Sequence, residues 1–118
     1  MKIIDSGTFE VAPDEFITLA IDKSSAPYQA TATLTGATWS APPDPHGLSA
    51  HGGFKSPHKS GARATLTIVF DFTPKADGSF PPGDRYDVTI AGLPNGDRRR
   101  QTIFAGGLQS RSYTFKVA

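Results

Sequence analysis

Hydrophobic and polar residues alternate one by one along most of this chain. The pattern is clearest between residues 64 and 91, where two alternating runs enclose a turn-rich connector. The apolar residues of the two runs are Leu66, Ile68, Phe70, Phe72, Tyr86, Val88 and Ile90. Period-two alternation with β-branched and aromatic residues is typical of strands that bury one face. This stretch therefore predicts two core strands.

Shorter runs of the same kind lie on both sides of this central stretch. They cover residues 3–4, 8–11, 16–22, 28–34, 101–104 and 112–117. Turn-forming residues separate them, and Asn95-Gly96 favours the two positive φ angles of a type I′ hairpin turn. No segment of ten residues or more has the 3.6-residue period of a helix. We expect an antiparallel all-β sandwich or barrel of seven to nine short strands.

The composition is that of one domain without covalent cross-links. A chain of 118 residues is long enough to bury a core, and 12 glycines and 10 prolines suit many turns. Cysteine is absent, which excludes disulfides and thiolate chemistry. Residues 1–44 hold six acids and two bases (−4), whereas residues 45–118 hold five acids and ten bases (+5). We expect a folded sandwich to mix these charges over its surface, although the asymmetry is also compatible with an electrostatic face.

The start of the chain does not resemble a signal peptide, because Asp5 follows only two isoleucines. No run approaches the ~20 apolar residues that a membrane span needs. We expect a soluble monomer without membrane insertion and without a cofactor. Its compartment stays open, since the chain is equally compatible with a secreted or surface domain expressed without its signal.

The alternation stops in residues 40–61, which contain four prolines, four glycines and all three histidines. Loops of this length are usually functional or mobile, so we expect a long exposed loop. His46, His51 and His58 together with Asp44 have the donor atoms for a zinc-type ion. Their spacings of five and seven match no metal signature, and solvated side chains on a flexible loop are the alternative.

Arg98, Arg99 and Arg100 follow the predicted hairpin turn. Such a cluster is able to bind anionic polymers or lipids. In a strand, however, at most two of the three share a face, and stacking aromatic residues are not interleaved with them. We therefore expect no nucleic-acid partner and assign these charges to a solvated sheet edge that discourages aggregation.

Residues 33–44 and 80–91 resemble the fibronectin type III pattern. The first stretch leads from a strand to Trp39, followed by prolines and Asp44, and the second places Pro82-Gly83 before Tyr86. The resemblance implies an immunoglobulin-like or fibronectin type III-like sandwich in which the Tyr86 hydroxyl bonds to nearby backbone. The chain departs from the pattern before Trp39, where 38 residues exceed one strand, and after it, where the tyrosine-bearing third strand is missing.

Trp39 has two interpretations. A core tryptophan above the small residues Ala30 and Ala32 is the favoured one, and an exposed platform for a sugar ring beside Asp44 is the other. Residues 1–118 contain no Gly-x-Ser-x-Gly nucleophile elbow and no phosphate-binding glycine loop.

We expect a non-catalytic recognition module that contacts a protein or glycan partner through residues 40–61 and 92–100. A metal- or carbohydrate-binding domain that uses the histidines and Trp39 is the alternative, and a small hydrolase is the third possibility.

Overall fold

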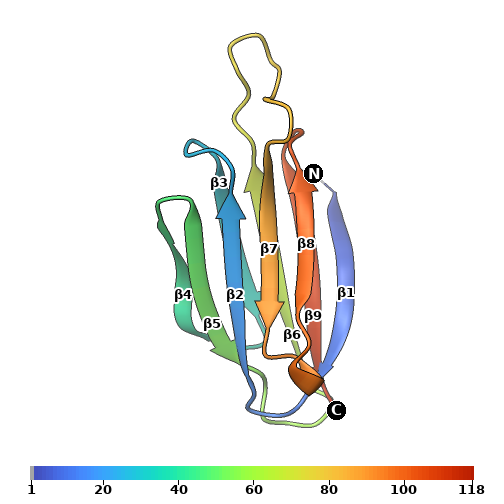
Figure 1. Cartoon of the computed structure of the whole chain (residues 1–118). Helices are drawn as coiled ribbons and strands as arrows, with labels where there is room; N and C mark the ends of the chain where they lie inside the picture. The colour runs from blue at the N-terminus through green and yellow to red at the C-terminus, as the bar shows by residue number, and fades with distance from the viewer. Residues whose placement is uncertain (1) are drawn as a thin grey trace.

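Two facing sheets make up the protein in the computed structural model, which describes residues 2–118 (Figure 1). The nine strands of this part are β1 (Ile3–Val11), β2 (Phe16–Lys23), β3 (Gln29–Thr35), β4 (Trp39–His46), β5 (Ser49–Lys55), β6 (Arg63–Asp71), β7 (Arg85–Ala91), β8 (Arg99–Phe104) and β9 (Gln109–Val117). A short 3-10 turn, η1 (Pro94–Gly96), lies between β7 and β8. The predicted all-β sandwich and its strand number are confirmed. Within residues 2–118 no helix is long and apolar enough to cross a membrane.

One sheet has the strand order β1-β9-β6-β3, and the other has the order β4-β5-β2-β7-β8. All neighbouring strands are antiparallel except β1 and β9, which run parallel. The prediction of a wholly antiparallel sandwich is therefore wrong at this edge. Parallel pairing needs a long connection between the two strands, and β1 and β9 are separated by the rest of the domain.

The core lies between the sheets and consists of the inward residues of the alternating runs. Phe70 and Tyr86, both predicted to be buried, have no exposed surface, and their rings lie 5.0 Å apart. The Tyr86 hydroxyl donates to the backbone carbonyl of Asp71 at 3.0 Å. The predicted bond from this hydroxyl to backbone is thus present, and it ties β7 to the end of β6 in the opposite sheet.

The segment 40–61 is not a long loop, so this prediction is wrong. It forms the hairpin β4–β5, and only residues 56–62 remain as a connector before β6. Prolines are tolerated because β4 is an edge strand whose ladder with β5 has two register shifts. A Cβ at Gly52 would lie 2.6 Å from the Ala41 carbonyl oxygen, so the close approach of the two strands requires glycine there.

The connection from β7 to β8 contains the predicted turn. Asn95 and Gly96 have φ angles of 64° and 71°, and the Asp97 N–H donates to the Pro94 carbonyl. The strands do not reach this turn, because β7 ends at Ala91 and β8 begins at Arg99. Local sequence therefore determines the turn but not the length of the hairpin.

Candidate functional site

The four edge strands of residues 2–118 are β1, β3, β4 and β8, and they differ in how they are protected. β1 has a register irregularity between Asp5 and Thr8, β4 contains three prolines, and β8 begins with two arginines. Bulges, prolines and charges of this kind prevent another strand from pairing. β3 has the sequence QATATLT and pairs with β6 through all seven residues without a register shift. It therefore presents a regular, uncharged edge with free backbone N–H and C=O groups.

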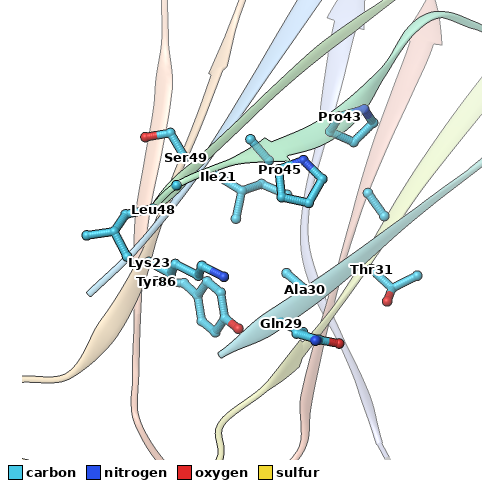
Figure 2. A pocket seen from close by; sticks show the side chains of 13 residues that line it. Ile21, Lys23, Gln29, Ala30, Thr31, Pro43, Pro45, Leu48, Ser49 and Tyr86 are labelled. Atoms are coloured by element: carbon cyan, nitrogen blue, oxygen red, sulfur yellow. The ribbon is translucent and has the colours of Figure 1, made fainter. Parts of the chain in front are cut away.

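An open cleft of about 430 Å³ lies beside β3, between the two sheets (Figure 2). Its walls are mostly apolar and come mainly from β2, β3, β4 and β5, with Tyr86 of β7 added at one place. They include Ile21 from β2, Ala30 and Ala32 from β3, Pro43 and Pro45 from β4, and Ala50 from β5. The cleft exists because alanine side chains are too short to fill the space between the sheets.

The sheets are offset, so that the five-stranded sheet extends past β3. Tyr113 of β9 bonds to Gln101 of β8, and Phe70 of β6 packs on Tyr86 of β7, which places β9 opposite β8 and β6 opposite β7. The next strands in the two sheets are β3 and β2, which lie opposite each other. β3 is the last strand of its sheet, whereas the other sheet continues with β5 and β4, which have no strand opposite them beside β3. The inward residues of β4 and β5 consequently form one wall of the cleft next to β3.

Lys23 lies at the end of the cleft where β2 finishes and β3 begins (Figures 1 and 2). Its ammonium group donates to the carbonyl oxygens of Ala26 at 2.9 Å and Tyr28 at 2.7 Å. A lysine ammonium has three N–H donors, so one remains for a ligand. No carboxylate in the described part of the chain lies within ion-pair distance of Lys23. The cleft thus ends at a positive charge that no acidic side chain neutralises.

The hydroxyl groups of the two tyrosines near the cleft each donate a hydrogen bond to a group of the protein itself. The Tyr28 hydroxyl donates to the Asp84 carboxylate at 2.7 Å, and burial together with this carboxylate raises the pKa of Tyr28 to about 12. Burial and the negative charge of Asp71 also raise the pKa of Tyr86. Both hydroxyls stay protonated near neutral pH and already have acceptors. No histidine lines the cleft, so the Ser49 hydroxyl there has no imidazole base beside it.

The three histidines are not brought together. His46 and His51 lie on the β4–β5 hairpin, where His51 is opposite Asp44. His58 lies in the connector after β5, and its ring nitrogen Nδ1 bonds to the Asp14 carboxylate. This hydrogen bond and the charge of Asp14 raise the pKa of His58. Among residues 2–118 no group of three histidines and acidic residues is close enough to hold a metal ion.

The structure does not bring the three predicted arginines into one hollow. Arg98 and His51 line the same shallow hollow of about 320 Å³ on the outer face of the five-stranded sheet. Arg100 lines the next hollow together with Asp22 and Asp87. Arg99 lines neither of these hollows. One hollow therefore contains residues of both segments that were predicted to contact a partner, namely His51 and Gly52 from 40–61 and Arg98 from 92–100.

Trp39 packs against the hydrophobic core, as its favoured interpretation expects. It is half-buried at the start of β4, where its ring lies nearly perpendicular to the ring of Phe54, with centroids 5.8 Å apart. It is not among the residues that line the cleft. The alternating alanines did signal an unfilled space, but the space is open rather than occupied by the tryptophan.

Comparisons with protein-family models, curated proteins and solved structures found no match to this chain. The cleft and the charge at its end were not anticipated from the sequence as a site. One signal was present, since Lys23 continues the inward series of Ile17, Leu19 and Ile21. A lysine at an inward position of a core strand indicates either a buried partner or a ligand.

Proposed function

We propose that this chain is a non-catalytic recognition module that binds an extended segment of a partner protein along β3. The observation that carries the proposal is the combination of a regular, uncharged strand edge with an open apolar cleft directly beside it. The other edges of the described sheets have bulges, prolines or charges. Addition of a strand to a free edge is a common way for domains to bind peptides.

The added segment would be held in two ways. Its backbone would pair with the free N–H and C=O groups of β3, which supplies affinity without regard to sequence. Every second side chain would point between the sheets, over Ala30 and Ala32 and under Pro43 and Pro45. Each aliphatic side chain fully buried there contributes about 1.5–3 kcal/mol. Apolar residues at alternate positions are therefore the expected feature of the partner.

A second copy of the chain fits this edge poorly. Continuous pairing of two β3 strands around a two-fold axis would place both five-stranded sheets on the same side of the joined sheet. The β4–β5 hairpin of each copy extends past its own β3 and would meet the hairpin of the other copy. A single extended segment avoids this collision.

The strand order supports a finer assignment of the fold, and we propose an immunoglobulin-like sandwich. Immunoglobulin domains have strands C, F and G in one sheet and strands B, E and D in the other. β3-β6-β9 and β2-β5-β4 have this order. The β7–β8 hairpin is then an insertion between F and G that takes the place beside B where strand A lies in immunoglobulin domains. In this assignment Tyr86 belongs to the insertion rather than to strand F, so the match of residues 80–91 to fibronectin type III is local.

The other functions have less support. A metal site would need the separated histidines to converge, and a sugar platform would need an exposed Trp39 ring, whereas Trp39 is half-buried against the core. A hydrolase of the serine–histidine type would need a histidine beside Ser49, and none lines the cleft. The paired His58 and Asp14 side chains are 87% and 53% exposed, which leaves them without the enclosed pocket that catalysis requires.

The test uses a fluorescein-labelled peptide, Ser-Lys-Val-Thr-Val-Thr-Val, with a free carboxyl end. We expect binding measurable by fluorescence anisotropy, and slower hydrogen exchange of backbone amides in β3. The variant Ala32→Phe fills the cleft with its own ring and should weaken binding at least tenfold. The matched control Ala20→Phe places the same ring on the outer face of β2, where binding should be unchanged. Absence of binding at millimolar protein, or equal binding by Ala32→Phe, would refute strand addition.

A further inference from the structure

We propose that the segment bound along β3 is the carboxyl terminus of its protein, and that Lys23 binds the terminal carboxylate. This inference rests on the strand addition proposed above and names the kind of segment involved. It follows from the position of Lys23, from the direction of β3 and from the residues around the end of the cleft.

The position of Lys23 leaves its charge available to a ligand in the cleft. Its side chain points between the sheets, and Figure 2 shows its nitrogen directed toward the open space. Carbonyl oxygens of Ala26 and Tyr28 hold the ammonium group in place and leave its third N–H free. Asp22, which precedes Lys23 in the chain, accepts a bond from Ser49, and Asp84 accepts one from Tyr28, the residue whose carbonyl Lys23 holds.

The direction of β3 decides which end of a bound segment reaches Lys23. β3 runs from Gln29 to Thr35, and Gln29 directly follows the residue whose carbonyl Lys23 holds. A segment that pairs antiparallel with β3 has its carboxyl end beside Gln29. A segment that pairs parallel has its amino end there, and a free amine would meet the ammonium group. Charge therefore favours antiparallel addition with the carboxylate at Lys23.

The surroundings of this end favour a small apolar final residue. Leu48, in the turn between β4 and β5, lines the same end of the cleft as Lys23 and is 48% exposed. Pro45 and Tyr86 complete the wall. A terminal valine or leucine side chain would contact these groups while its carboxylate accepts the third N–H of Lys23. Hydrogen bonds to a charged group are roughly twice as strong as neutral ones.

The experiment compares the free-acid peptide Ser-Lys-Val-Thr-Val-Thr-Val with its carboxyl-terminal amide. On the natural protein the acid should bind about tenfold more tightly than the amide. Lys23→Met should bind both forms equally, whereas Lys23→Arg should keep the preference. Lys75→Met, which removes an exposed lysine outside the cleft, is the matched control and should behave like the natural protein.

Each result has one meaning. Equal binding of acid and amide by the natural protein would overturn the assignment of a carboxyl terminus, and the comparison needs no variant. A preference that persists in Lys23→Met would overturn the role of Lys23. In both cases protection of the β3 amides would leave strand addition intact. Failure of both peptides to bind would instead refute strand addition itself.

Discussion

Ser56 and Ser110 are two buried polar side chains within residues 2–118, and they lie in opposite hydrogen-bonding situations. Ser56 is 3% exposed and Ser110 is 1% exposed. The Ser56 hydroxyl donates to the Ala12 carbonyl at 2.6 Å and accepts the Glu15 N–H at 2.8 Å, which ties the turn between β1 and β2 to the end of β5. The Ser110 hydroxyl has no hydrogen-bond partner among the described residues. Replacing each serine with alanine should therefore have opposite effects.

The magnitude follows from the number of bonds that each hydroxyl makes. A hydrogen bond contributes about 1 kcal/mol to stability, and a buried group left without a partner costs about 1–3 kcal/mol. Ser56→Ala removes two bonds, but water reaches the exposed backbone of the β1–β2 turn. We expect a loss of about 1–2 kcal/mol in the free energy of unfolding. Ser110→Ala removes an unpaired hydroxyl and should leave stability unchanged or raise it by up to about 1 kcal/mol.

Urea denaturation measures both changes. The fluorescence of Trp39, the single tryptophan, reports on the β4–β5 hairpin, and circular dichroism reports on the whole sandwich. The two variants should keep the urea dependence of the natural protein and shift only the midpoint. A loss of stability in Ser110→Ala as large as that in Ser56→Ala would refute the reasoning, because it would mean that the hydroxyl makes a favourable interaction.

Three further predictions concern titration and backbone conformation. The hydrogen bond to Asp14 raises the pKa of His58 above 6.5, so its contribution to stability is complete below pH 6.5 and disappears as pH rises through the higher folded value. Asp14→Asn should return the NMR midpoint of the His58 ring toward 6.5, and an unchanged midpoint would contradict this cause. Burial raises the pKa of Tyr28 to about 12 and also raises the pKa values of the other two tyrosines. The native protein should therefore show less tyrosinate absorbance at pH 10 than urea-unfolded protein, and stability should fall above pH 10. Gly36→Ala should destabilise the protein far more than Gly61→Ala, whose cost is about 1–2 kcal/mol, as urea midpoints will show. Both glycines have φ near +80°, but a Cβ at residue 36 would lie 2.2 Å from a backbone oxygen and a Cβ at residue 61 meets nothing within 4 Å.

Local patterns in the sequence were sufficient to predict the core strands and one turn. Successive side chains of a strand point to opposite faces whatever its neighbours are, so Leu66, Ile68 and Phe70 were placed on one buried face from their spacing alone. Asn95 and Gly96 adopt positive φ because both residue types tolerate it. Rules that depend on a few adjacent residues can be applied before the partners of a strand are known.

The position of a strand within its sheet depends on which other strands pair with it, and the predictions from sequence were wrong about such positions. Pro42, Pro43 and Pro45 argue against an interior strand, but β4 has a neighbour on one side only and accommodates them. The parallel pairing of β1 with β9 is a similar case, because residues at the two ends of a chain carry no local signal of their mutual direction. Whether a strand is central, peripheral, parallel or antiparallel is decided when the sheets assemble.

The candidate site depends even more than the sheet edges on how the two sheets pack together. The alternation in the sequence was sufficient to predict that residues 28–34 form a strand with small residues on one face, but the predicted strand before it ended at Asp22 and Lys23 was assigned to a turn. The assembled sheets were needed to show that β3 ends its sheet, that β4 and β5 extend beyond it, and that the space between them stays open. A cleft is bounded by strands distant in sequence, so its existence depends on the order and offset of two sheets. The same offset leaves the charge of Lys23 without a partner at the end of the cleft.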